Sequence, residues 1–238
     1  MQYGIMAEEA CRGVFQRIND RFQCDNCHKE RINFSGKDKK KNNSYSNLLP
    51  GFSSESMKLP VDLLIIAEAH GGGREEDFRE QGDLEKEIAN LAEYYLDKRL
   101  KKFHQQQIRY LLDYLNGNKI RWIFTDLIKC FVWRGHDKKN NVEGSDNVRI
   151  AINNCRIYLN EQIQVLRPKK VLALGKTVAV EYLGLPKKLN HGSNYEPDPI
   201  ANHKFPVIYS IFPSQFTADL WVEHGGWEKI FNSMNALG

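Results

Sequence analysis

Four apolar runs, each long enough for one buried strand, constrain the fold of this chain more than any other feature of its sequence. The runs cover residues 61–67, 121–130, 169–175 and 205–212. Stretches with helical spacing of apolar residues lie between and after them, at 83–116, 147–166, directly after Gly175, and at 216–235. Continuous apolar strands that alternate with helices are typical of a parallel sheet covered on both faces. We therefore predict an α/β fold, a three-layer sandwich with a central four-stranded parallel sheet flanked by helices.

The chain of 238 residues fits a single domain that spans residues 1–238. We expect a helix followed by a Cys-x-x-Cys segment in residues 1–34, and a mobile Ser/Asn/Lys-rich insertion at about 35–58. No apolar run approaches the roughly 18 residues that span a bilayer, and the N-terminus lacks the apolar core of a secretory signal. We expect a cytoplasmic monomer without a membrane partner. The net charge of +4 permits nucleic-acid binding without requiring it.

Five cysteines suggest an inorganic centre rather than disulfides. Cys24 and Cys27 form a Cys-x-x-Cys pair, Cys130 ends the second predicted strand, and Cys155 lies in the helix that follows. In a reducing compartment such a pair more often binds a metal or does redox chemistry. Four thiolates suit either zinc or an iron–sulfur cluster. Cys11 has no place in this pattern.

The first strand ends in residues that suit close contact with a ligand. Glu68 and His70 follow the apolar run and precede Gly71, Gly72 and Gly73. Ligand sites in parallel α/β folds lie at the carboxyl ends of the strands. The four strand ends that matter are therefore 68–73, 126–130, 175–177 and 212–215. Three glycines after a carboxylate leave room for a ligand to approach the backbone.

The order of these motifs resembles the iron–sulfur (family 4) branch of the uracil-DNA glycosylase superfamily. That branch opens with Cys-x-x-Cys, continues with a strand ending in Gly-Glu-Ala-Pro-Gly and then Glu-Asp, and later has Asn-Val-Val-Lys-Cys. A helix with the fourth cysteine, a strand ending in Leu-Gly and a His-Pro motif follow. The matching stretches are 24–27, 67–77, 126–130, 153–177 and 212–214. The chain is identified as a divergent member.

The resemblance implies a monofunctional DNA glycosylase. Such an enzyme flips a base out of double- or single-stranded DNA and hydrolyses its N-glycosidic bond, which leaves an abasic site. The resemblance also favours a [4Fe-4S] cluster over zinc, beside the sheet and with a structural role. Its implied ligands are Cys24, Cys27, Cys130 and Cys155.

The same resemblance assigns the catalytic candidates. Glu68 stands at the motif glutamate, and we expect it to stabilise the oxocarbenium-like sugar or to orient the attacking water. Glu76 and Asp77 match the Glu-Asp that follows, although an exposed acidic turn explains them equally well.

Base-binding and DNA-binding candidates come from the strand ends. The predicted base-binding residues are Asp126, His70, Gly71 and Phe78. The predicted DNA-binding residues are Lys176, Thr177, Ser214, Gln215 and His191. A core aromatic is the alternative for Phe78, a surface imidazole for His70, and the N-cap of an ordinary turn for Ser214.

Two departures from the family bear on the substrate. Asp126 replaces an asparagine that reads uracil, and an ionised carboxylate only accepts hydrogen bonds. It suits the exocyclic amino group of cytosine, although cytosine N3 then needs a second donor or a protonated Asp126. Phe212 replaces the family's histidine, and His191 and His70 are the two candidates to take its role. We predict excision of a modified cytosine-type base from foreign (phage) DNA, in antiviral defence. The alternatives are uracil excision in base-excision repair and a catalytically degraded DNA-binding module.

Overall fold

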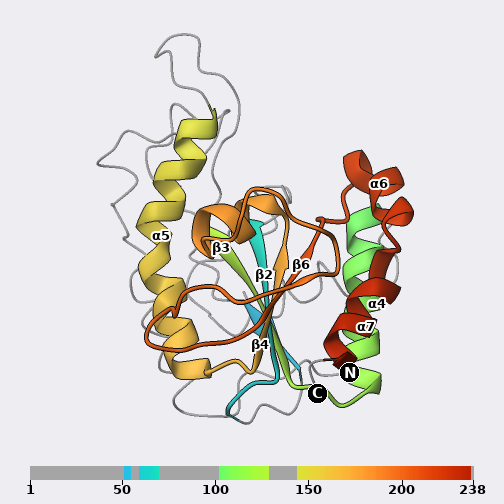
Figure 1. The fold of residues 1–238 in the computed structure, drawn as a ribbon, viewed down its shortest axis with the longest axis horizontal. Coiled ribbons are helices and arrows are strands. Elements are labelled where there is room, and N and C mark those ends of the chain that lie inside the picture. The colour runs from blue at the N-terminus through green and yellow to red at the C-terminus, as the bar shows by residue number, and fades with distance from the viewer. Residues whose placement is uncertain (1–50, 55–58, 70–101, 129–143, 237–238) are drawn as a thin grey trace, which may run out of the picture.

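The computed structural model describes residues 51–54, 59–69, 102–128 and 144–236 (Figure 1). Its elements in chain order are β1 (Phe52–Ser53), β2 (Leu63–Ala69), α4 (Phe103–Gly117), β3 (Trp122–Ile128), α5 (Gly144–Leu166), β4 (Lys170–Leu174), η2 (Val178–Tyr182), β5 (Asn194–Tyr195), β6 (Val207–Ser210), η3 (Gln215–Thr217), α6 (Ala218–Glu223) and α7 (Gly226–Ala236). The predicted N-terminal helix and Cys-x-x-Cys segment in residues 1–34 lie outside the described residues.

One six-stranded sheet organises these elements, in the order β1-β3-β2-β4-β6-β5. The pairs β2–β3, β2–β4 and β4–β6 are parallel, whereas β1 and β5 pair antiparallel with β3 and β6 at the two edges. The predicted α/β class is confirmed, but the sheet has two more strands than the four expected. Each extra strand is two residues long, too short to produce a periodic pattern.

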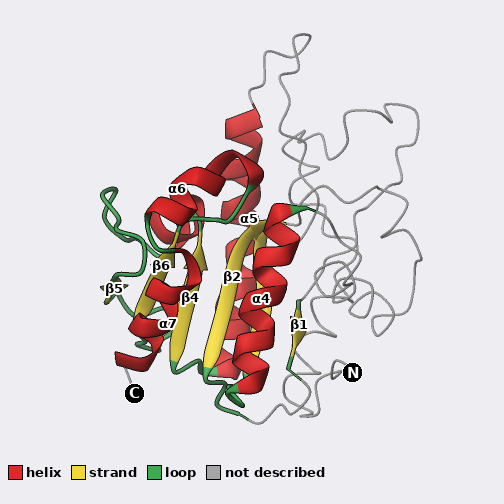
Figure 2. Ribbon diagram, turned by 90° about the vertical axis from the view of Figure 1, so that its right-hand side faces the viewer, coloured by secondary structure: helices red, strands yellow, loops and turns green. Residues whose placement is uncertain are grey.

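Helices α4 and α7 lie side by side on one face of the sheet (Figures 1 and 2). The indole nitrogen of Trp122 in β3 donates to the Asn116 side chain in α4 at 2.9 Å. The Lys170 ammonium at the start of β4 donates to the Met234 carbonyl in α7 at 2.7 Å. These contacts show which strand residues point toward the α4–α7 layer.

Helix α5 covers the opposite face (Figure 1). Thr125 in β3 donates from its hydroxyl to the buried Gln162 side chain of α5 at 3.3 Å. Because successive side chains of a strand point to opposite faces, residues 122, 124 and 126 share the α4–α7 face, and 125 and 127 share the α5 face. All seven residues of β3 are buried, so both layers close over it.

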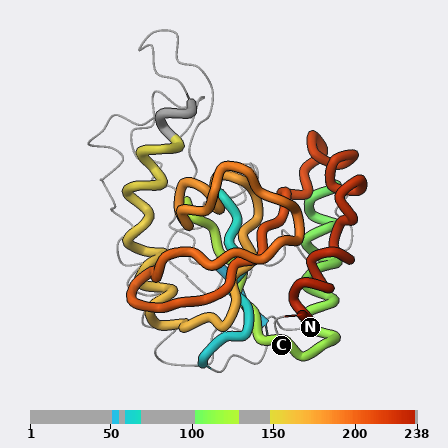
Figure 3. Tube along the Cα trace, in the orientation of Figure 1, coloured from blue at the N-terminus to red at the C-terminus, as the bar shows by residue number. Residues whose placement is uncertain are grey.

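Three expectations for the chain path need correction. The stretch 35–58 is not a loop throughout, because Phe52 forms an edge strand and packs its buried ring on Phe124 at 5.3 Å between centroids. The helix expected at 216–235 is interrupted at Gly225 and Gly226, which adopt positive φ angles of 89° and 51°. The helix expected after Gly175 is one π-helical turn, η2. Figure 3 follows the long connection, residues 183–206, that leads from η2 through β5 to β6.

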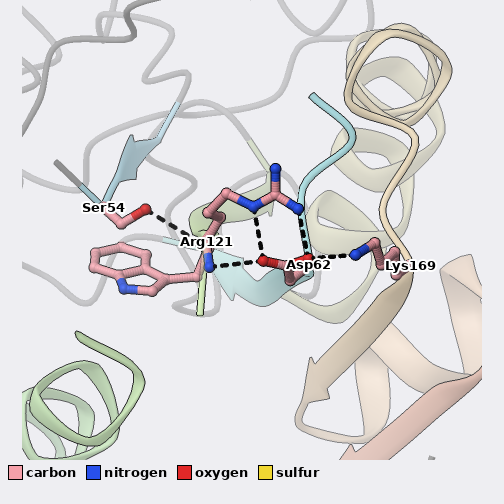
Figure 4. Close-up of polar contacts among 5 residues, drawn as sticks. Ser54, Asp62, Arg121 and Lys169 are labelled. Atoms are coloured by element: carbon pink, nitrogen blue, oxygen red, sulfur yellow. Dashed lines mark hydrogen bonds and ion pairs between the residues drawn. The ribbon is translucent and has the colours of Figure 1, made fainter. Parts of the chain in front are cut away.

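The amino ends of three central strands are joined by a cluster of charges (Figure 4). Asp62 precedes β2 and accepts from the Arg121 guanidinium through both oxygens, at 2.7 and 2.8 Å. Lys169 approaches the same carboxylate at 2.8 Å. The hydrogen bond from Arg121 holds the pKa of Asp62 far below its usual value. This cluster lies at the edge opposite the carboxyl ends of the strands. No helix among the described residues is long and apolar enough to cross a membrane.

Candidate functional site at the carboxyl edge of the sheet

The carboxyl ends of β2, β3, β4 and β6 meet at one edge of the sheet, as parallel pairing requires. Glu68 and Asp126 are among the last three residues of β2 and β3, at this edge. Gly175 follows β4, and Phe212 follows β6. Backbone pairing therefore brings the four strand ends that the sequence singled out to one edge of the sheet.

Asp126 lies under the α4–α7 layer. Its side chain is fully buried and shares a face with Trp122 and Phe124. The residue beside it on β2 is Ala67, which is also buried and has only a methyl side chain. Both side chains are fully covered, so the carboxylate lies in the interior of the described structure.

Glu68 lies at the same edge on the other face. It follows Ala67, and the pairing of Ala69 with Ile128 keeps the alternation regular through the end of β2. Its half-buried side chain therefore points to the α5 face, whereas Asp126 points to the α4–α7 face. The two acids are one residue apart in register but on opposite sides of the sheet.

The turn after β6 is held by a short hydrogen-bonded network. The Ser214 amide donates to the Thr217 hydroxyl at 2.9 Å, and the two hydroxyls are 3.0 Å apart. Ser214 thus caps η3, as the alternative interpretation of this residue expects. Gln215 is exposed, and Phe216 is 100% exposed, the most exposed large apolar side chain among the described residues. Phe216 was missed by sequence reasoning, although an apolar residue in a Ser-Gln-Phe-Thr turn is a usable signal.

His104 is a second residue that sequence reasoning missed. It lies in the first turn of α4, and its ring centroid is 6.3 Å from that of Phe212. Burial, and to a smaller extent the charge of Lys102, lower the pKa of His104. A lowered pKa favours the neutral form of the ring. His104 is half-buried and lies four residues before the fully buried Ile108, while the buried residues of α4 begin at Gln105.

A family model for the uracil DNA glycosylase superfamily matches residues 74–225, which is more than half of the chain. This chain belongs to the uracil-DNA glycosylase superfamily. No curated protein matches it in a sequence comparison. Superfamily membership confirms the resemblance at that level and supports a DNA glycosylase-like function.

His191 has a structural role in this superfamily member. Its ring is buried, with Nε2 donating to the Gly226 carbonyl at 2.8 Å and Nδ1 accepting from the Ile211 amide at 3.2 Å. Trp221 packs edge-on against it at 4.8 Å. Burial lowers the pKa of His191, which keeps the ring neutral. This placement argues against the predicted DNA contact and against substitution for the family histidine, because both ring nitrogens are engaged inside the protein.

Lys176 and Thr177 follow β4 at the same edge of this glycosylase-superfamily domain. Lys176 is exposed and Thr177 half-buried. Gly175 precedes them with a φ of 96°, and a Cβ there would stand 3.5 Å from the Cβ of Phe212. The β4 and β6 ends are thus in contact.

Of the four cysteines predicted to bind a cluster, Cys155 lies within the described residues. Its side chain is buried in α5 at 2% exposure. Among the described residues, no three His, Cys, Asp or Glu side chains form a group that could hold a metal ion. Predicted site residues outside the described ranges are Cys24, Cys27, Cys130, His70, Gly71, Glu76, Asp77 and Phe78.

Proposed function

We propose that this superfamily member is a monofunctional DNA glycosylase that removes a modified cytosine-type base, from foreign (phage) DNA, in antiviral defence. The observation that carries the proposal is the placement of Asp126, fully buried at the carboxyl edge beside Ala67. A base that enters this edge meets a carboxylate under the α4–α7 layer.

The chemistry of Asp126 favours cytosine over uracil. An ionised carboxylate accepts from the exocyclic amino group of cytosine, whereas it repels the O4 carbonyl of uracil. Ordinary cytosine is present throughout every genome, so a useful enzyme needs a further feature on its target. A substituent at C5 provides one, because the amino group that Asp126 contacts is unchanged by it.

Phe216 supports extraction of the base from a duplex. An apolar side chain that is fully exposed, on a turn fixed by Ser214 and Thr217, suits insertion between stacked bases. A wedge of this kind fills the space left by a flipped nucleotide. Lys176 is exposed at the end of β4 and suits contact with a phosphate of the DNA strand that carries the flipped nucleotide.

Glu68 supports hydrolysis. Its position on the opposite face from Asp126 allows a nucleotide lying over the edge to meet one acid through its base and the other through its sugar. A carboxylate beside the sugar stabilises the positive charge that develops as the glycosidic bond breaks. Water is the nucleophile, so the product is an abasic site.

The position of Cys155 supports the proposed cluster. Cys155 lies seven residues, or about 10 Å, along α5 from Gln162, which contacts Thr125. The end of β3 lies three residues, or about 10 Å, beyond Thr125. The buried thiol is therefore level with Ile128, and Cys130 follows two residues later in the sequence. A cluster bound there by Cys24, Cys27, Cys130 and Cys155 would tie the N-terminal segment to the sheet; zinc is the less favoured occupant.

A base panel tests the proposal. Duplex and single-stranded oligonucleotides that carry uracil, cytosine or a C5-substituted cytosine are incubated with the protein, and abasic sites are cleaved by alkali. We expect release from C5-substituted cytosine, with Glu68→Gln strongly impaired but still able to bind an abasic-site duplex. Efficient release of uracil by the wild type would instead identify a repair enzyme. DNA binding without release of any base would identify a catalytically degraded DNA-binding module. The replacement of the family histidine by Phe212 favours that alternative.

A further inference from the structure

We infer that His191 is a positioning residue for the turn at 212–217, which it holds at both ends, so that the wedge residue Phe216 stands at a fixed place when it enters a duplex. This role rests on the proposed function, because the wedge is part of it. Phe216 is 100% exposed, so packing of its own side chain does not fix it. Its position therefore depends on how the turn is attached to the rest of the protein.

The turn is a rigid unit because of its internal hydrogen bonds. The Thr217 hydroxyl donates to the Phe212 carbonyl at 2.5 Å, and the Ser214 amide donates to the same hydroxyl at 2.9 Å. The Thr217 amide donates to the Ser214 carbonyl at 3.1 Å. All three bonds lie within the turn, so any displacement of its two ends moves Phe216 as well.

His191 holds the first end of the turn. The last carbonyl of β6, that of Ser210, accepts from the Gly175 amide at 2.8 Å, and the chain then leaves the sheet. The next amide, that of Ile211, donates to Nδ1 of His191 at 3.2 Å. The imidazole therefore binds the first backbone amide after β6, directly before the turn begins at Phe212.

The same ring holds the second end of the turn. Trp221 lies in α6, four residues after Thr217, and packs edge-on against the His191 ring at 4.8 Å between centroids. Nε2 of His191 donates to the Gly226 carbonyl at 2.8 Å, at the break between α6 and α7 (Figure 1). A Cβ at Gly226 would stand 3.3 Å from the Trp221 indole nitrogen, so these two residues are neighbours beside the imidazole.

The imidazole is itself held from outside the turn. The amide of the next residue, Gly192, donates to the Tyr209 carbonyl of β6 at 2.8 Å, and the Gly192 carbonyl accepts from the Ser233 hydroxyl of α7. His191 is only 3% exposed, so water does not compete for its two hydrogen bonds. Burial also lowers the pKa of His191, which favours the neutral ring that these bonds need, with one nitrogen donating and the other accepting.

A double-mutant cycle with Phe216 tests this role. Single-turnover excision of a C5-substituted cytosine is measured on matched duplex and single-stranded oligonucleotides, and the ratio of the two rates is compared between variants. His191→Leu removes both hydrogen bonds, and we expect the duplex-to-single-strand ratio to fall about 5- to 10-fold while the single-strand rate changes little. In a Phe216→Ala background the same substitution should change the ratio by less than about 2-fold, because the side chain that His191 positions is gone.

Conservative variants separate positioning from a general loss of packing. His191→Asn places an amide oxygen near the position of Nδ1, keeps an acceptor for the Ile211 amide, and should restore part of the ratio. His191→Gln reaches toward Gly226 instead and should restore less. These two variants carry the test if circular dichroism shows that His191→Leu does not fold. His203→Leu is the matched control, since His203 contacts the Pro168 carbonyl at 2.9 Å next to the amino end of β4, and its ratio should equal that of the wild type.

Three results would overturn the positioning role. The first is a wild-type ratio in folded His191→Leu, or in His191→Gln if the leucine variant does not fold. The second is an equal fall of the ratio with and without the Phe216 side chain, because His191 would then act on the fold rather than on the wedge. The third is a ratio for His191→Asn no higher than that for His191→Gln. A wild type that releases no base from either substrate would overturn the proposed function, and this role with it.

Discussion

Replacing Asp126 by asparagine changes the hydrogen-bonding pattern of the pocket with almost no change in volume. The carboxylate accepts at both oxygens, whereas an amide accepts at one atom and donates at the other. Asparagine therefore suits the O4 and N3–H groups of uracil and faces the amino group of cytosine poorly. We expect Asp126→Asn to lose activity on C5-substituted cytosine and to gain activity on uracil.

The magnitude follows from the burial of the side chain. Asp126 is fully buried, so each mismatched contact is made without relief from water. A paired readout of this kind is worth about 1–3 kcal/mol for each base, so the ratio of the two excision rates should shift by about 2–6 kcal/mol, or at least about 30-fold.

Competition between two duplexes in one reaction measures this ratio directly. A cytosine-type and a uracil duplex, with different fluorescent labels, compete for limiting enzyme, and alkaline cleavage reports both products. Circular dichroism melting serves as the control for folding. An Asp126→Asn variant that folds normally, excises, and keeps the base preference of the wild type would show that Asp126 does not read the base.

Three further changes test other parts of the argument. Phe216→Ala should lower the rate on duplex DNA by about 10-fold or more, while the rate on single-stranded DNA changes little, because only a duplex needs a wedge; equal losses on both substrates would contradict this. Asp62→Asn should cost about 1–3 kcal/mol of unfolding free energy at pH 7 by urea titration. Since the pKa of Asp62 is lowered in the folded state, this stabilisation is full above its unfolded pKa of about 3.9 and is lost at lower pH, so wild type and variant should converge on acidification. Cys155→Ser should lower the broad absorbance near roughly 400 nm that a cysteine-ligated iron–sulfur cluster gives, and a colourless wild type that contains zinc would refute the cluster.

Local sequence was sufficient to predict the elements that are long and regularly patterned. The strands β2, β3, β4 and β6 were predicted within a few residues, because each is an uninterrupted apolar run. Asp126 and Glu68 were located at strand ends for the same reason. The motifs also identified the superfamily, since their order along the chain does not depend on knowing the fold.

Other elements depended on contacts between distant residues. Phe52 is a strand only because Trp122 and Phe124 offer it an aromatic surface, with ring centroids 5.6 and 5.3 Å away. His191 was predicted to contact DNA, whereas its two ring nitrogens contact Ile211 and Gly226 inside the protein. Neither partner is near in the sequence, so no local pattern contains the information.

The sequence by itself determined the α/β class, the superfamily and the acids at the strand ends, because apolar periodicity and motif order are local properties of a chain. Only the tertiary structure decided that Asp126 and Glu68 point to opposite faces, that His104 and Phe212 meet at the edge, and that Phe216 is fully exposed. Strand register determines the faces to which Asp126 and Glu68 point. The packing of α4 against the sheet determines the contact between His104 and Phe212. Exposure depends on what the rest of the chain leaves uncovered.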